Sequence, residues 1–244
     1  MIQPALSQDP PAVDPVQVRR IAIAIPAYNE AGAIGDVIRD SLAVLAEVAS
    51  EYEVLVGNDG SQDRTGAIAD ELARAHPQVR VVHHARNQGV ARTCWELYRM
   101  AQTDWVAFFP GDGQIPPGEL RAMLGGLDRM DVVVGHRYPR RDPAHRLVTA
   151  WLWNAAGRFL FGLNVRDMDS VKLYPMSLIR SIEIESASPF METEILIKAA
   201  RLGLRVGNVN VAHRPRRAGR QTGLRPRVVA GALAELLRYW WAHR

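Results

Sequence analysis

Two oxygen-bearing side chains, Asp112 and Gln114, stand two residues apart between glycines, directly after the apolar and aromatic run 105–109. Such a run is typical of a buried strand. Side chains at i and i+2 of an extended segment leave the same face, so both groups can point an oxygen at one hard cation, such as Mg²⁺ or Mn²⁺. A polar turn that only ends a strand would have the same composition, and this stretch alone leaves both interpretations open.

The segments before this stretch must position it. Short apolar strands are expected at 21–25, 53–56, 79–82 and 105–109, and helices between them at 30–49, 61–75 and 89–101. This alternation predicts an α/β fold with a mostly parallel sheet that is flanked by helices on both faces. Ligands of such sheets bind outside the carboxyl ends of the strands. All four strand ends are polar, glycine-bearing or both, which favours a binding site around Asp112 and Gln114.

The second half of the chain is less regular. Strands are expected at 132–134, 171–174 and 205–210, and helices at 145–163, 192–202 and 228–243, with a basic loop at 214–227. Residues 1–18 contain four prolines and are expected to be a disordered tail, which leaves 19–244 as a single domain. The sequence has neither a secretion signal nor a run long and apolar enough to span a bilayer, so a cytoplasmic protein is expected.

Charge is unevenly distributed along the chain. The formal net charge is +4, but the segment from Arg201 to the end holds ten arginines and one acid, Glu235. A basic end indicates an anionic partner. Nucleic acid is not expected, because no recognition fold or basic–aromatic alternation accompanies these arginines. Cys94 is the only cysteine, which excludes an intramolecular disulfide and argues against a cysteine metal site.

The strand-end motifs, taken together, resemble those of inverting family 2 glycosyltransferases. They are Ile-Pro-Ala-Tyr-Asn-Glu at 25–30, Asn-Asp-Gly-Ser-Gln-Asp-Arg-Thr at 58–65, Asn-Gln-Gly at 87–89 and Gly-Asp-Gly-Gln at 111–114. Two later motifs, at 169–174 and 192–196, resemble the dolichyl- or polyprenyl-phosphate mannosyl and glucosyl synthases of that family. The resemblance covers roughly residues 20–220. It implies a GT-A fold with a Rossmann-like sheet, a UDP- or GDP-sugar donor and Mg²⁺ or Mn²⁺.

The resemblance also implies roles for single residues. It divides the domain into a nucleotide-sugar-binding half, 19–115, and an acceptor half, 116–244, with its basic segment and C-terminal amphipathic helices. The donor-binding residues that it implies are Pro26, Tyr28, Glu30, Asp59 and Asp112. Carboxylates suit this task because they accept hydrogen bonds from ribose hydroxyls and base N–H groups. Asp63, in contrast, is expected to cap a helix rather than to bind a ligand.

Three residues depart from the family pattern. The metal motif is Asp-x-Asp-x-Gln, and Pro110 stands where its first Asp is expected; Asn58 replaces an Asp, and Val90 replaces a Lys found in many relatives. The metal is therefore expected to rest on Asp112 and Gln114, with diphosphate oxygens and water completing its shell. Asp112 is expected to be its main protein ligand.

A phosphate acceptor would explain the arginines. A phosphate monoester is charged at neutral pH, so it needs cations that position it rather than a general base. The family resemblance assigns a catalytic, acceptor-binding role to Arg137, and arginine suits bidentate phosphate contacts. Further candidates are Arg146, Arg214, Arg216, Arg217 and Arg220. The predicted reaction is transfer of a sugar to a polyprenyl phosphate at the cytoplasmic face of the membrane.

Aromatic residues gather on two predicted helices of the second half. They are Trp151, Trp153, Phe159 and Phe161 on the first, and Tyr239, Trp240 and Trp241 on the last. Such belts are typical of helices at a membrane interface, and a peripheral membrane protein is expected. Packing of the same residues onto the sheet is the alternative.

Two other functions are compatible with the sequence. The acceptor can be the hydroxyl of a saccharide or small molecule, which normally needs a carboxylate base. The candidate bases are Asp167, Asp169, Glu192 and Glu194. Alternatively, the protein binds a nucleotide sugar without transferring it, because Pro110 and Asn58 make the metal site less acidic. Residue types do not define the donor base, the sugar or the oligomeric state.

Overall fold

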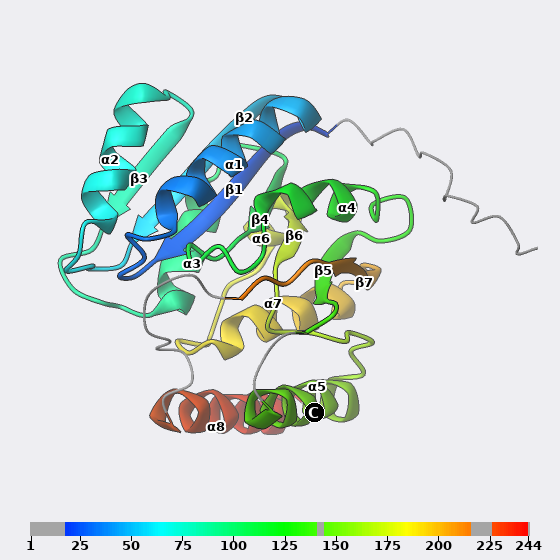
Figure 1. Ribbon diagram of the computed structural model, residues 1–244. Coiled ribbons are helices and arrows are strands. Elements are labelled where there is room, and N and C mark those ends of the chain that lie inside the picture. Colours follow the sequence, from blue (N-terminus) through cyan, green and yellow to red (C-terminus); the bar gives the residue numbers. More distant parts are fainter. Residues whose placement is uncertain (1–17, 141–143, 216–225, 244) are drawn as a thin grey trace, which may run out of the picture.

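A computed structural model describes residues 18–140, 144–215 and 226–243, and strands from both halves of the chain form one sheet (Figure 1). The seven strands lie in the order β3-β2-β1-β4-β6-β5-β7. Their bounds are β1 Val18–Ala27, β2 Ala49–Asn58, β3 Val79–His83, β4 Trp105–Phe108, β5 Val132–Arg137, β6 Lys172–Pro175 and β7 Val206–Val211. All pairings are parallel except those of β6, which is antiparallel to both β4 and β5. The predicted mostly parallel sheet is confirmed.

The sequence of β1 explains how the central strand supports two cores. Successive side chains of a strand point to opposite faces, and Ile21, Ile23 and Ile25 all enter one buried cluster, whereas Ala22 and Ala24 enter the other. The small alanines leave room for α3 (Val90–Met100) to pack closely on their face. Because both faces are covered, the strand is apolar throughout, as expected for a parallel sheet.

The helices form layers on the two faces of the sheet (Figure 1). On the isoleucine face lie α1 (Ile34–Val48), α2 (Thr65–Ala75) and α4 (Leu120–Leu124), the last preceded by a short turn of 3-10 helix, η1 (Pro117–Glu119). On the other face lie α3, α5 (Ala144–Phe161), α6 (Met176–Ser181), α7 (Phe190–Arg201) and α8 (Pro226–Ala242). Within this second group, α5 and α8 lie beyond α7, at the bottom of Figure 1.

Most predicted elements are present with ends shifted by a few residues. The sequence pattern did not predict α4 and α6. These helices have five and six residues and are too short to show a helical period. Val18, placed in the expected tail, is the first residue of β1, and residues 1–17 lie outside the described ranges. Cys94 is buried in α3. No helix in the described part of the chain has the length and apolar character that crossing a bilayer requires.

Candidate active site

The loops after β1 and β2 are joined by four hydrogen bonds. The hydroxyl of Ser61 accepts from the Asn29 N–H at 3.0 Å, and the Asn29 side chain accepts from the Gln62 N–H at 2.8 Å. Asn29 has a positive φ of 56°, which asparagine tolerates better than most residues. Two further bonds run from the backbone N–H groups of Glu30 and Ala31, to the hydroxyl of Thr65 at the start of α2 at 2.8 Å and to Asp63 at 3.1 Å. The first two strand ends therefore form one unit.

Asp63 receives the last of these bonds and lies two residues before the first residue of α2. Its carboxylate accepts from the N–H of Thr65, the first residue of that helix, at 2.9 Å, and from the N–H of Ala31. Burial opposes its charge, but the hydrogen bonds from Thr65 and Ala31 outweigh burial and hold the pKa of Asp63 below its usual value. Asp63 lies one residue before Arg64, the N-cap of α2, and satisfies a backbone donor at the start of the helix.

Asp59 ties the second loop to the third. Its carboxylate accepts from the backbone N–H groups of Gln88 at 2.8 Å and Gly89 at 2.9 Å, and it contacts Nδ1 of His84 at 2.7 Å. Gly60 packs beside these groups with φ +70°, and a Cβ there would lie 2.5 Å from the Arg86 carbonyl carbon. Only glycine fits this approach, so the second and third strand ends are held together around one buried carboxylate.

His84 lies between two carboxylates. Its Nε2 is 2.8 Å from Glu96 of α3, opposite the contact of Nδ1 with Asp59. Burial of the ring favours the neutral form, but the two carboxylates favour the imidazolium more strongly, and the pKa of His84 is raised. A protonated ring donates from both nitrogens and so satisfies both acids.

Asp112 and Gln114 lie on one tight turn after β4. A carboxylate oxygen of Asp112 accepts from the Gln114 N–H at 3.0 Å, and Gly113 between them has a φ of +69°. Carboxylate and amide oxygens are hard ligands that suit Mg²⁺ or Mn²⁺. Within the described ranges, no group of three or more His, Cys, Asp or Glu side chains is arranged to hold a metal alone. One carboxylate and one amide oxygen on the same turn fit a cation that takes its other ligands from a diphosphate and water.

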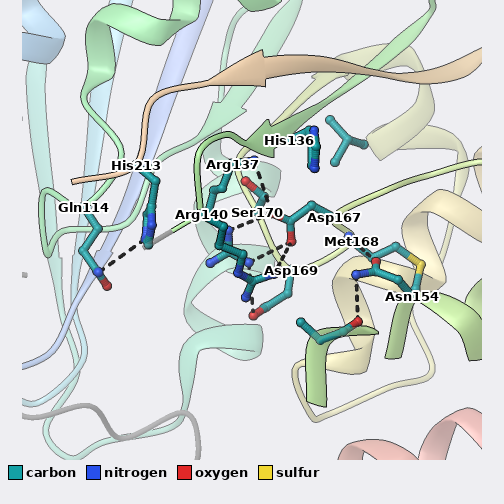
Figure 2. Close-up of polar contacts among 12 residues, drawn as sticks. Gln114, His136, Arg137, Arg140, Asn154, Asp167, Met168, Asp169, Ser170 and His213 are labelled. Atoms are coloured by element: carbon teal, nitrogen blue, oxygen red, sulfur yellow. Dashed lines mark hydrogen bonds and ion pairs between the residues drawn. The ribbon is translucent and has the colours of Figure 1, made fainter. Parts of the chain in front are cut away.

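The segment after β7 reaches this turn. The N–H of Arg214 donates to the Gln114 carbonyl at 2.7 Å, and the amide nitrogen of Gln114 lies 3.4 Å from both Nε2 of His213 and the Arg214 carbonyl. Figure 2 shows Gln114 and the buried His213 pointing toward each other. With its nitrogen turned to these groups, the Gln114 side chain presents its oxygen on the other side.

Arg137 ends β5 in a buried ion pair (Figure 2). Its Nε and Nη2 lie 2.7 and 2.8 Å from the two oxygens of Asp167, whose side chain is 2% exposed, and Arg140 adds a contact at 3.4 Å. Burial raises the pKa of Asp167, but the two arginines lower it more, so the carboxylate is charged. Asp169 lies 4.0 Å from Arg137 and its side chain is 71% exposed.

Two acids of α7, Glu192 and Glu194, accept hydrogen bonds from other parts of the protein. Glu192 accepts from the hydroxyls of Tyr98 at 2.6 Å and Tyr174 at 2.8 Å, and Lys172 lies 3.3 Å away. Burial and the nearby Glu192 raise the pKa values of both tyrosines well above normal, which keeps them as neutral donors. Glu194 is fully buried and accepts from two backbone N–H groups of the 185–186 segment, each at 2.9 Å.

The family model described as Glycosyl transferase family 2 matches residues 22–181. This range includes every contact described above, except those between Gln114 and the segment after β7 and those of the two acids of α7. The chain belongs to this family. Its members are glycosyltransferases, and so is this protein.

Two curated relatives match this family 2 glycosyltransferase over most of its length. One is the polyprenol monophosphomannose synthase of Mycolicibacterium smegmatis, 28% identical over 87% of this chain and 83% of the relative. Another is the undecaprenyl-phosphate mannosyltransferase of Micrococcus luteus, 28% identical over 92% of this chain and 96% of the relative.

Solved structures share the fold of this glycosyltransferase. One is glucosyl-3-phosphoglycerate synthase from Mycobacterium tuberculosis in complex with Mn²⁺, UDP-glucose and phosphoglyceric acid, with a TM-score of 0.70 and 24% identity over 91% of this chain and 80% of that one. The same enzyme with Mg²⁺ and UDP has a TM-score of 0.68, at 24% identity over 89% of this chain and 79% of that one. The likeness confirms the GT-A fold expected from the strand-end motifs.

The glycosyltransferase fold brings most of the predicted donor residues to one edge. Pro26 and Glu30 are buried and Tyr28 is half-buried in the loop joined to Ser61, while Asp59 is enclosed by the third loop. The Pro26 carbonyl also accepts from the N–H of Gly111, which joins the first strand end to the metal turn at 3.2 Å. Their roles toward a ligand stay predictions.

The predicted acceptor arginines are only partly described. Arg137 lies in its pair with Asp167, and Arg214 is exposed beside Gln114. Arg146 belongs to α5, but its side chain lies outside the described set, as do all atoms of Arg216, Arg217 and Arg220.

Three residues of this region were not singled out from the sequence. His84 and His213 sit next to motifs, but only their partners give them a role. Arg140 follows Arg137 by three residues in an Arg-rich stretch. This spacing is the sequence feature that could have indicated a second arginine at the Asp167 carboxylate.

Proposed function

We propose that this glycosyltransferase transfers a sugar from a nucleoside diphosphate to a polyprenyl phosphate, using Mg²⁺ or Mn²⁺, at the cytoplasmic face of the membrane. The observation that carries the proposal is the pair of arginines, Arg137 and Arg140, converging on Asp167 at the carboxyl end of β5. Two guanidinium groups at one strand end suit bidentate contacts to the phosphate of an anionic acceptor. The acceptors named for the two curated relatives are of this class.

The donor would occupy the edge formed by the joined strand ends. Pro26, Tyr28, Glu30 and Asp59 are the proposed contacts to base and ribose. The solved relatives with UDP or UDP-glucose support this donor class. Asp112 and Gln114 would hold the cation, which would neutralise charge on the leaving diphosphate as a Lewis acid.

The chemistry needs no base in this chain. An acceptor phosphate oxygen attacks the anomeric carbon while the bond from that carbon to the diphosphate oxygen breaks. The electron pair leaves with the nucleoside diphosphate, and the anomeric configuration inverts. The acceptor is already an anion, so no proton has to be removed. Arg137 would bind and orient the phosphate, and Asp167 would fix the direction of its guanidinium.

A hydroxyl acceptor would require a carboxylate base. Of the four candidate acids, Asp167, Glu192 and Glu194 are held by arginines, tyrosines or backbone N–H groups. A base must reach the proton that it removes, and groups committed in this way are poorly placed to do so. Only Asp169 among the four is exposed beside Arg137, so a hydroxyl acceptor would depend on Asp169.

The decisive experiment incubates the purified protein with labelled UDP- and GDP-sugars and a polyprenyl phosphate in detergent, with Mg²⁺, Mn²⁺ or a chelator. We expect label in the lipid phase for one donor, with loss of transfer after chelation. No transfer to any polyprenyl phosphate across these donors would overturn the acceptor assignment. Nucleotide binding that ignores both metals, without turnover, would instead favour a binding protein.

A further inference from the structure

Helix α5 has an exposed apolar stripe. Val148, Trp151, Leu152 and Phe159 are all exposed, Trp151 by 63% and Phe159 by 87%. Residues with this spacing share one face of a helix. The stripe therefore faces solvent, although side chains of this kind are normally buried.

Helix α8 has a second stripe of the same kind. Leu233, Leu237 and Trp241, four residues apart, are exposed by 45%, 49% and 71%. The opposite face of α8 points inward, because Ala232, Leu236 and Tyr239 belong to the core. An ordinary surface helix would be polar on its outer side, so α8 is apolar on both sides.

The inward aromatics join the two helices. The ring centroids of Phe161 of α5 and Tyr239 of α8 lie 6.1 Å apart. Both rings contact Phe190 of α7, and so does the ring of Trp153. Figure 1 shows α5 and α8 at the same end of the molecule, beyond α7. The predicted aromatic belt is thus divided: Trp153, Phe161 and Tyr239 pack inward, while the stripes form an outer surface.

Among the described side chains, the exposed charged residues of the two helices themselves are arginines. Helix α5 contains no acid, and Arg158 beside Phe159 is exposed. The one acid of α8, Glu235, is turned inward, where it accepts from the N–H groups of Ala187 and Ser188 at 3.3 and 3.1 Å. Arg238 has a 74% exposed side chain, and its guanidinium lies 3.7 Å from the less exposed Glu235. Apolar stripes on helices that have exposed arginines and no outward acid of their own are complementary to an anionic lipid surface.

We propose that α5 and α8 form a docking surface that inserts its two stripes into the headgroup region of an anionic bilayer. Each helix would lie in the plane of the membrane, with exposed arginines at the lipid headgroups.

This surface is connected in the chain to the acceptor cations. Helix α5 begins four residues after Arg140, and α8 begins twelve residues after Arg214. Docking would therefore hold the acceptor side near a lipid-borne phosphate, and this part of the inference rests on the proposed function. The insertion itself does not.

Vesicle sedimentation tests the insertion. The full-length protein is mixed with phosphatidylcholine vesicles, with and without phosphatidylglycerol. A double variant, Phe159→Glu plus Leu237→Glu, is tested in the same way. We expect wild type to prefer the anionic vesicles, less so at high salt. Each lost apolar side chain should lower partitioning by about tenfold. The matched control is Ala43→Glu, an exposed position of α1 on the other face of the sheet, which should bind as wild type does.

Several results would overturn the proposal. They are failure of wild type to sediment with vesicles, equal binding by the double variant, and equal binding to neutral vesicles. If wild type does not bind vesicles and the double variant differs from it in oligomeric mass, the stripes would instead contact a second copy of the chain. Circular dichroism and melting temperature establish that each variant is folded.

An activity comparison separates this inference from the proposed function. The double variant should lose transfer to polyprenyl phosphate embedded in vesicles, yet retain transfer to a short-chain, water-soluble prenyl phosphate. If wild type transfers to neither acceptor, the proposed function fails, and the sedimentation result still decides the docking surface. Equal loss on both acceptors would contradict a membrane role of the stripes.

Discussion

The backbone N–H of Arg214 donates to the carbonyl of Gln114 at 2.7 Å, across 100 residues of sequence. This bond fixes the start of the basic segment against the turn that carries Asp112. The turn that is proposed to hold the cation and one of the proposed acceptor arginines, Arg214, are therefore neighbours in the folded chain.

Asp112 should contribute more to catalysis than Gln114. Replacing Asp112 by Asn removes the one carboxylate of the turn and should lower kcat/KM about 100-fold or more. Gln114→Asn keeps an amide and should cost about tenfold or less. Initial rates and Mn²⁺ affinity, measured by electron paramagnetic resonance with nucleoside diphosphate present, check both. Two equally mild variants would place the metal elsewhere.

Asp167 should be essential for stability. Asp167→Asn leaves the Arg137 guanidinium buried beside a neutral amide, and breaking a buried pair in this way costs about 3 kcal/mol or more. Urea denaturation measures the loss. The matched control is Asp131→Asn, which breaks a similar bidentate pair with Arg205 at the surface and should leave the free energy of unfolding nearly unchanged. Equal effects would contradict the role of burial.

Arg137 and Asp169 distinguish the two classes of acceptor. If the acceptor is a phosphate, Arg137→Ala should raise the acceptor KM and lower kcat/KM by about 100-fold, since a charged hydrogen-bonding partner is lost. Asp169→Asn should then change the rate by less than about tenfold. The opposite ranking, with Asp169→Asn inactive, would favour a hydroxyl acceptor.

His84 should make stability depend on pH. Its pKa is raised in the folded protein, so its contribution is fully present below the unfolded value of about 6.5 and is lost as pH rises through the folded value. The difference in free energy of unfolding between wild type and His84→Gln should therefore shrink above about pH 6.5. Urea titrations at several pH values measure it, with His76→Gln as the control. A difference that stays constant with pH would contradict the imidazolium between Asp59 and Glu96.

The sequence alone predicted the order of most strands and helices and the edge of the sheet where a ligand site lies. The Ile-Ala alternation at 21–25 indicated a strand covered on both faces, and the polar strand ends indicated where a ligand site lies. The turn that holds Asp112 and Gln114 was also predictable, since both residues follow one strand and are two residues apart. These features are local, and their period or spacing is visible without knowledge of any distant partner.

Tertiary structure decided which distant groups meet. The pairing of Arg137 with Asp167, the contact of His213 with Gln114 and the position of His84 between Asp59 and Glu96 depend on how strands and loops pack. The two helices show the same limit: Trp151 and Trp153 are two residues apart on α5, yet one is exposed and the other packs on Phe190. A helical pattern gives the faces of a helix, but only the surrounding layers determine which face is covered.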